Sequence, residues 1–283
     1  MVARPRFHII FYFNRKRAEI GEGHHAGHDG RNHHQEGEAA VTAVTRPVGG
    51  RARDTGDVIR AVVFDLDGVL LDSERLWDQA RREVAAQHHG RWRADATAAM
   101  LGMSSVEWSR YMRDTLGVDL APGQIVDLVV ANLLEHYRHG LPLIPGAVAA
   151  VRRIGGRWPL ALASSAGRPV INAVLAIAGL QNAFQATVSS EEVPRGKPAP
   201  DVYLEAATRL GQSPLACAAV EDSANGIRSA LAAGLRVVAI PNPDYPPPDS
   251  VLARAQIVIG GLADLTVELV DRLDAGDAGD PRD

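Results

Sequence analysis

Residues 58–74 read VIRAVVFDLDGVLLDSE, a largely apolar run that leads directly into two aspartates. The part at 59–64 is short and almost free of polar residues, which is typical of a strand buried on both faces of a parallel sheet. Four later segments have the same character: residues 159–163, 215–220, 235–240 and 256–259. Five such segments spaced along the chain predict a parallel sheet that begins with residues 59–64.

Helical patterns alternate with these strands. Residues 169–178, 200–210 and 224–233 have helical spacing, and each is followed by a glycine where a helix ends. Alternation of strand and helix predicts the α/β class, with a Rossmann-like parallel sheet at its core.

The segment 73–142 interrupts this alternation, because it contains no good strand and several amphipathic helices. Two helical faces stand out: Trp77, Ala80 and Val84 on one, and Ile125, Leu128, Val129 and Leu133 on the other. We interpret Trp92, Trp108 and Tyr111 as core or pocket-lining residues of the same segment. The position of the insert, directly after the first strand, predicts a small all-helical cap over the carboxyl ends of the strands, where α/β sheets bind ligands.

The two ends of the chain differ from the rest. Residues 1–57 carry six of the ten histidines without a sustained period, and residues 273–283 are rich in Gly and Asp. We expect both to be disordered, with the α/β core in residues 58–72 and 143–272 and the cap in residues 73–142. An alternative for the N-terminal extension is that the native protein starts near Val58, since a valine codon can serve as a start.

Composition excludes several classes of protein. The chain of 283 residues has a net charge of -4, 46% hydrophobic and 23% charged residues. Together with a pI near 6.2, this argues against nucleic acid or a membrane as partner. The single cysteine, Cys217, excludes an intrachain disulfide, which fits a cytoplasmic protein, and lies in an apolar run typical of a core. We further expect a monomer or a weak homodimer.

Polar residues of the types that bind metals or take part in catalysis follow the strands. Asp65 and Asp67 leave the first strand, Ser164 and Ser165 end the strand at 159–163 and precede a helix, and Glu221-Asp222-Ser223 ends another strand. A further segment, Gly196-Lys197-Pro198, lies ahead of a helix. Because strand ends of one sense meet at one edge of a parallel sheet, we expect these side chains to converge.

Several carboxylates at one edge require a cation. Two of them about 4 Å apart repel by about 4 kcal/mol at an effective dielectric of 20. A ligand set of oxygens without His or Cys favours Mg²⁺. An attacking carboxylate, a metal, a lysine and a hydroxyl are the parts of a phosphoryl-transfer site that works through an aspartyl-phosphate.

At these motifs the sequence resembles the haloacid dehalogenase superfamily, in the branch with a small helical cap, and is similar to β-phosphoglucomutases and small-metabolite phosphatases. The matching segments are DLDGVLLDSE at 65–74, ASS at 163–165, GKPAPD at 196–201 and EDSANGI at 221–227. The resemblance covers about residues 58–272. It implies a Mg²⁺-dependent enzyme that acts on a small phosphorylated metabolite.

The resemblance also implies roles for individual residues. Asp65 is expected to be the nucleophile and Asp67 the general acid and base, while Ser164, with Ser165 beside it, and Lys197 would hold the phosphoryl oxygens. The implied Mg²⁺ ligands are the Asp65 carboxylate, the Asp67 backbone carbonyl and Asp222, with Glu221 binding directly or through water. Asp72 and Ser73 are expected in the cap hinge.

Three functions remain open from the sequence. The presence of Asp67 argues against a dehalogenase and leaves a phosphatase, which we favour, or a sugar-phosphate mutase. A mutase of this family usually carries an arginine where Ser105 stands here, although Arg110 or Arg113 could substitute. The third is a non-catalytic protein that binds a phosphorylated ligand. Such a protein could lose Asp67 or Lys197 without cost, yet both are present.

Overall fold

The computed structural model describes residues 58–100 and 103–273. Its strands are β1 (Ala61–Phe64), β2 (Leu160–Ser164), β3 (Ala186–Ser189), β4 (Cys217–Glu221), β5 (Arg236–Ala239) and β6 (Ile257–Val258). Its α-helices are α1 (Glu74–Gln87), α2 (Ala96–Met100), α3 (Ser105–Asp114), α4 (Pro122–His139), α5 (Ala147–Gly155), α6 (Arg168–Ile177), α7 (Asp201–Arg209), α8 (Ala224–Ala232), α9 (Asp249–Leu252) and α10 (Val267–Asp271). Two short 3-10 helices, η1 (Ser190–Glu192) and η2 (Pro214–Ala216), complete the set.

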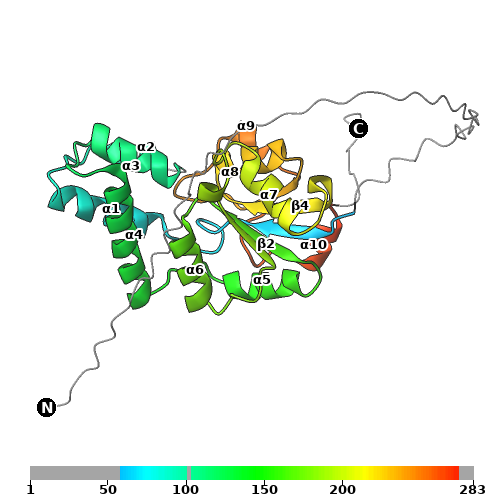
Figure 1. Cartoon of the computed structure of the whole chain (residues 1–283). Helices are drawn as coiled ribbons and strands as arrows, with labels where there is room; N and C mark the ends of the chain where they lie inside the picture. The colour runs from blue at the N-terminus through cyan, green and yellow to red at the C-terminus, as the bar shows by residue number, and fades with distance from the viewer. Residues whose placement is uncertain (1–57, 101–102, 274–283) are drawn as a thin grey trace, which may run out of the picture. The chain divides into compact units, whose positions relative to one another are not determined.

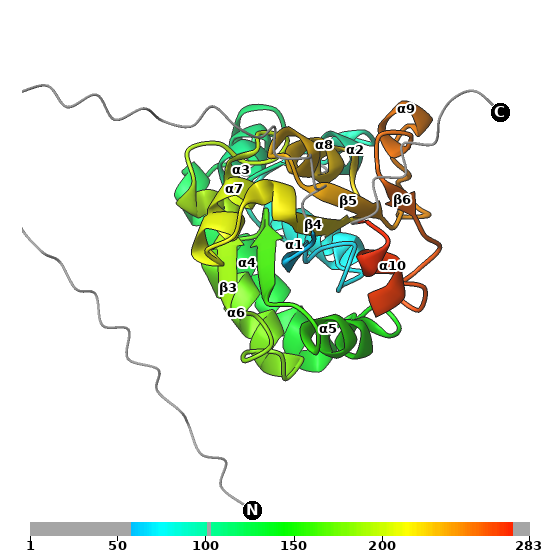
Figure 2. The ribbon, with the colours of Figure 1, turned by 90° about the vertical axis from the view of Figure 1, so that its right-hand side faces the viewer.

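The strands form one parallel sheet in the order β3-β2-β1-β4-β5-β6. Because side chains alternate along a strand, β1 supplies both faces of the sheet. Val62 and Phe64 belong to the core shared with α5, α6 and α10, whereas Ala61 and Val63 belong to the core shared with α7 and α8. Figure 2 shows this three-layer arrangement, which confirms the predicted α/β class.

Strand β3 is missing from the prediction. It has only four residues, ATVS, two of them polar, and it pairs with β2 alone at the edge of the sheet. A short edge strand with polar residues gives no clear apolar run, so periodicity does not detect it.

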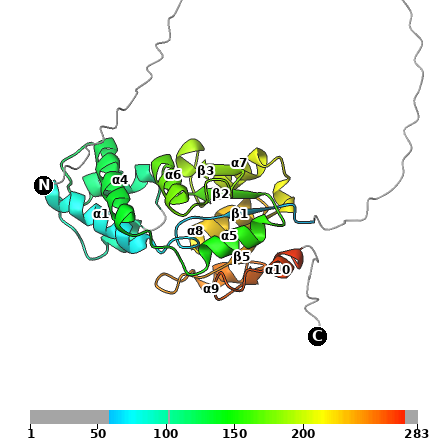
Figure 3. The same cartoon turned by 90° about the horizontal axis from the view of Figure 1, so that it is seen from below.

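Helices α1 to α4 follow β1 and precede β2, as the predicted all-helical insert requires (Figure 1). Helix α4 packs against α1 and α3, and α1 and α4 run side by side in Figure 3. The helix faces predicted to be apolar are buried with one exception. Leu128 is 37% exposed, whereas Ile125, Val129 and Leu133 are fully buried. No helix among the described residues is both long and apolar enough to cross a membrane.

The predictions for the chain ends fall mostly outside the described residues. That holds for all of residues 1–57 and for residues 274–283. Leu273, which the prediction placed in the C-terminal tail, is instead 5% exposed and packs in the core. Its apolar side chain continues the buried positions of α10, so the ordered core extends at least to this residue.

Hydrogen bonds from Arg153 connect α5 to the segment after β6. Arg153 donates hydrogen bonds from Nε to the Leu265 carbonyl (2.9 Å) and from Nη2 to the carbonyls of Leu262 (2.8 Å) and Leu265 (2.7 Å). We expect Arg153→Met to lower the free energy of unfolding by about 1–3 kcal/mol, because it leaves these carbonyls without their donor. Urea denaturation measures it. Arg152→Met, on the same helix, is the control and should stay within about 0.5 kcal/mol of wild type; equal losses in both variants would contradict the assignment.

Candidate active site

The carboxyl ends of the central strands carry the predicted polar residues to one place. In the sheet register Phe64 lies between Leu162 of β2 and Val220 of β4. Asp65 follows Phe64 and donates its backbone N–H to the Val220 carbonyl at 3.0 Å, so its side chain lies next to Glu221. The carboxylates of Asp65, Glu221 and Asp222 have oxygen atoms within 4.8 Å of one another, and all three residues are buried.

Lys197 is the cation at the centre of this cluster. Its Nζ donates to Asp65 Oδ1 at 2.7 Å and to Glu221 Oε1 at 2.6 Å. The lysine comes from the loop between η1 and α7 and is 8% exposed. A segment far from β1 in sequence therefore supplies the charge that lets two buried carboxylates lie side by side.

Burial dominates the titration of these groups. It raises the pKa of Asp65 from 3.8 to about 7, although Lys197 acts in the opposite direction. It also raises the pKa of Asp222 well above its usual range. For Lys197 burial alone would lower the pKa, but Asp65 and Glu221 outweigh it and the pKa is raised. Burial therefore favours the protonated forms of Asp65 and Asp222, because Lys197 alone does not compensate three buried carboxylates.

The donor set fits a divalent cation. Oδ1 of Asp222 is buried and has no hydrogen-bond partner among the described residues, which is costly unless a ligand reaches it. Carboxylate oxygens without nitrogen or sulfur ligands are the set that Mg²⁺ prefers. The carboxylate of Asp67 is not part of this group, and a role of its backbone carbonyl as a ligand stays a prediction.

Two glycines make room for the carboxylates. A Cβ atom on Gly68 would lie 1.9 Å from Asp222 Oδ2, and one on Gly226 would lie 1.9 Å from Glu221 Oε1. Gly68 also has φ +84°, a conformation that other residues rarely adopt. Both positions in the motifs therefore need glycine for close packing of the backbone against the site.

Glu221 is engaged by the protein on both oxygens. Oε1 accepts from Lys197 and from the Tyr203 hydroxyl at 2.5 Å, and Oε2 accepts from the Asp222 backbone N–H at 3.1 Å. Tyr203 lies on α7 and is fully buried. The sequence does not predict a role for Tyr203, because a tyrosine on the buried face of a helix matches no catalytic motif. The one available signal is its position, six residues after Lys197.

Asp67 lies beside the cluster and is tied to the start of the cap. Its Oδ1 accepts from the Ser73 hydroxyl at 2.5 Å and from Trp77 Nε1 at 3.1 Å. Ser73 was expected to be only a hinge residue, and Trp77 only a core residue, but both contact the candidate acid and base. Since both donors reach Oδ1, the second oxygen is the one suited to exchange a proton with a ligand.

Of the two predicted serines, the structure places only Ser165 on the cavity wall. Ser165 lines the same cavity as Asp65, Asp67 and Lys197. Ser164 ends β2, is fully buried, and accepts the Ala166 backbone N–H on its hydroxyl oxygen at 3.0 Å. Other lining residues that the sequence reasoning did not select are Asn225, Asn242 and Tyr245.

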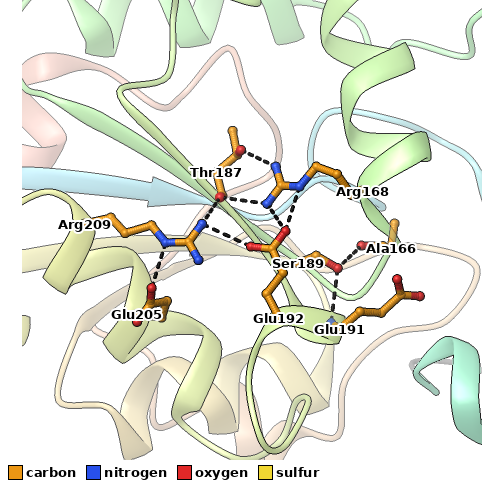
Figure 4. A network of polar contacts seen from close by, with 8 residues as sticks. All are labelled: Ala166, Arg168, Thr187, Ser189, Glu191, Glu192, Glu205 and Arg209. Carbon is orange, nitrogen blue, oxygen red and sulfur yellow. Dashed lines mark hydrogen bonds and ion pairs between the residues drawn. The ribbon is translucent and has the colours of Figure 1, made fainter. Parts of the chain in front are cut away.

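A polar network holds the loop that follows β2, as Figure 4 shows. The Ser189 hydroxyl donates to the Ala166 carbonyl at 2.8 Å and accepts the Glu191 backbone N–H at 3.1 Å. Arg168 donates to Thr187 and pairs with Glu192, which also pairs with Arg209. These contacts link the loop after β2 to η1, from which the chain continues to Lys197.

Other candidates from the sequence lie away from this cavity. Arg110 and Arg113 are exposed, and neither lines the cavity around Asp65. Trp108 is buried, as predicted for a residue of the cap core or pocket. Cys217 is buried in the sheet, and burial raises the pKa of its thiol to about 11, which fits a core residue.

Comparison with known proteins identifies a family and relatives that cover most of the chain. A profile of the haloacid dehalogenase-like hydrolases matches residues 59–234. Hexitol phosphatase B of Escherichia coli (strain K12) is 33% identical over 227 residues, which cover 74% of this chain and 96% of that protein.

Solved structures agree on the fold. CbbY from Rhodobacter sphaeroides in complex with phosphate superposes with a TM-score of 0.67 at 26% identity and covers 76% of this chain and 100% of that one. A β-phosphoglucomutase from Clostridium difficile superposes with a TM-score of 0.67 at 20% identity, covering 77% and 98%, and supports the fold alone.

The raised pKa of Asp65 predicts how Mg²⁺ acts on stability. Without metal, the folded state keeps a proton on Asp65 that the unfolded state releases above its pKa of 3.8, so stability falls as the pH rises from there to about 7. We expect millimolar Mg²⁺ to raise the melting temperature by roughly 5 °C at about pH 8 and by much less at about pH 5. Calorimetry with EDTA as reference measures both.

The matched control is Asp222→Asn, which removes one carboxylate and should lose most of the Mg²⁺ effect at the higher pH. Equal stabilisation at both pH values, or full stabilisation of this variant, would contradict a cation bound at these carboxylates.

Proposed function

Because the chain belongs to the family of haloacid dehalogenase-like hydrolases, we propose that it is a Mg²⁺-dependent phosphatase that hydrolyses a sugar or sugar-alcohol phosphate through an aspartyl-phosphate. Its phosphatase activity follows from the family and from its relatives. The single observation that carries the mechanism is the shared cavity of Asp65, Asp67 and Lys197. The similarity to a hexitol phosphatase supports the class of substrate.

In the first step, a carboxylate oxygen of Asp65 attacks phosphorus while the bond from phosphorus to the ester oxygen breaks. Asp67 enters this step protonated and donates its proton to the departing oxygen, so the alcohol leaves neutral. The hydrogen bonds from Ser73 and Trp77 to Oδ1 hold the Asp67 carboxyl group in a fixed orientation for this transfer.

In the second step, Asp67 is a carboxylate and accepts a proton from water, whose oxygen attacks phosphorus. The bond from phosphorus to Asp65 breaks, which releases inorganic phosphate and restores both aspartates. Lys197, which already donates a hydrogen bond to Asp65, neutralises charge on the nucleophile and on the phosphoryl oxygens. The backbone and hydroxyl of Ser165 supply further donors to those oxygens.

Mg²⁺ would be held by the Asp65 and Asp222 carboxylates and by the Asp67 backbone carbonyl. Glu221 would hold Lys197 in place through its hydrogen bond. When bound, the ion supplies positive charge that offsets the repulsion between an anionic nucleophile and an anionic phosphate. Tyr203 acts at a distance from the substrate by fixing Glu221.

The nucleophile is tested by Asp65→Asn, which keeps the shape of the side chain and removes its charge. We expect turnover of a hexitol phosphate to fall by about 10³-fold or more while the circular dichroism spectrum is unchanged. In the native enzyme, rapid quenching with radiolabelled substrate should recover phosphate bound to protein. Appreciable activity of the variant would exclude Asp65 as the nucleophile.

Hydrolysis and mutase activity are separated by their products. With Mg²⁺, β-glucose 1-phosphate and a trace of the bisphosphate, we expect free phosphate and no glucose 6-phosphate, because Arg110 and Arg113 are exposed and do not line the cavity. A hexitol phosphate should be hydrolysed in the same assay, and EDTA should stop the reaction. Glucose 6-phosphate as main product would instead identify a mutase.

A further inference from the structure

A second cavity adjoins the first on the cap side of Asp67. It shares Asp67, Glu74 and Ser165 with the first cavity. Since Asp67 donates its proton to the departing oxygen, the rest of the leaving group must extend past Asp67 and away from Asp65. The second cavity is the space on that side, so its walls contact the leaving group.

Arg81 lies in this wall, between two tryptophans. It is 5% exposed, and its guanidinium carbon is 5.2 Å from the ring centroid of Trp77 and 5.4 Å from that of Trp108. All three residues line the cavity. The rings and the α1 backbone therefore fix the guanidinium plane in one position.

The hydrogen-bonding capacity of Arg81 is largely unused. Its Nη1 donates to Glu74 Oε1 at the long distance of 3.5 Å, and its buried Nε has no partner among the described residues. A guanidinium carries five N–H donors, and within the described residues Arg81 uses only the one that bonds to Glu74. Because Arg81 lines the cavity, oxygen acceptors of a ligand there would bond to its Nη donors.

The charges around Arg81 decide what kind of acceptor fits. Burial lowers the pKa of Arg81, and the carboxylates of Glu74, Asp78 and Asp67 act on it in the opposite direction. Asp78 is paired with Arg82, whereas Glu74 faces the cavity and offsets the charge of Arg81. A second anionic group on the ligand would therefore meet no net positive charge there, whereas neutral hydroxyl groups need none.

We propose that Arg81 is a specificity-determining residue that donates hydrogen bonds to the hydroxyl groups of a neutral polyol leaving group. The inference rests on the proposed phosphatase function and adds the property of the leaving group that is selected. The planar guanidinium, held between the rings of Trp77 and Trp108, suits two neighbouring hydroxyl oxygens.

The test compares two substrates in wild type and Arg81→Met, a variant that keeps an unbranched apolar stem of similar length. One substrate is glucitol 6-phosphate and the other is phenyl phosphate, whose leaving group has no further hydroxyls. We expect kcat/KM for glucitol 6-phosphate to fall by about 10–100-fold, chiefly through KM, because the hydrogen bonds to the hydroxyls are lost. For phenyl phosphate we expect a change of less than about threefold.

Arg82→Met is the matched control, since Arg82 is adjacent in sequence but stacks over Trp92 and pairs with Asp78 instead. It should leave both substrates within about threefold of wild type. Arg81→Gln, which keeps neutral donors, should recover part of the lost activity on glucitol 6-phosphate. An equal loss on both substrates in Arg81→Met would mean that Arg81 only supports the cap, and no loss on either would mean that it does not contact the substrate; both results overturn the proposal.

Inhibition of the wild-type enzyme tests the same proposal even where a variant fails to fold. With phenyl phosphate as substrate, free glucitol should inhibit competitively, whereas gluconate, which differs by a carboxylate, should inhibit at least about tenfold more weakly. Stronger inhibition by gluconate would show that Arg81 selects an anion and would overturn the proposal. If wild type turned over neither phosphate ester, the proposed phosphatase function would fail instead, so the two failures are distinct.

Discussion

The ion pairs of Lys197 with Asp65 and Glu221 connect three segments that are remote in sequence: the end of β1, the end of β4 and the loop before α7. All three side chains are buried, so each charge depends on the others for its solvation. Removing one partner of such a buried pair leaves an uncompensated charge and typically costs about 3–5 kcal/mol. The arrangement at the sheet edge, including the close approach of Gly68 and Gly226, follows from the need to keep these groups together.

The placement of three buried carboxylates around one lysine also bears on the proposed chemistry. Asp65 is a nucleophile only when it is ionised, yet burial favours its protonated form. A divalent cation at Asp65 and Asp222 would favour the ionised form and bring the phosphate with it. Stability and chemistry thus depend on the same electrostatic imbalance, which is the usual condition of a catalytic centre.

The cap is coupled to this centre through Asp67. Ser73 and Trp77 donate to its carboxylate from the first turn of the helical insert, and one turn further along α1 Arg81 lies against Trp77. Trp77 contacts both Asp67 and Arg81, so this face of α1 connects the proposed acid and base with the second cavity.

The sequence alone was enough for the α/β class, the helical insert and the convergence of Asp65, Glu221 and Asp222, because strand periodicity and parallel pairing place strand ends at one edge. The motifs also identified Lys197 as the cation beside the nucleophile, but not its ion pair with Glu221. Strand β3, the bond of Tyr203 to Glu221, the exposure of Leu128 and the unpaired donors of Arg81 could not be read from the sequence. Each of these depends on which segments pack together, and contacts between residues distant in the chain leave no periodicity and no motif. They were decided by the tertiary structure, because only packing determines which buried polar groups find partners and which remain available to a ligand.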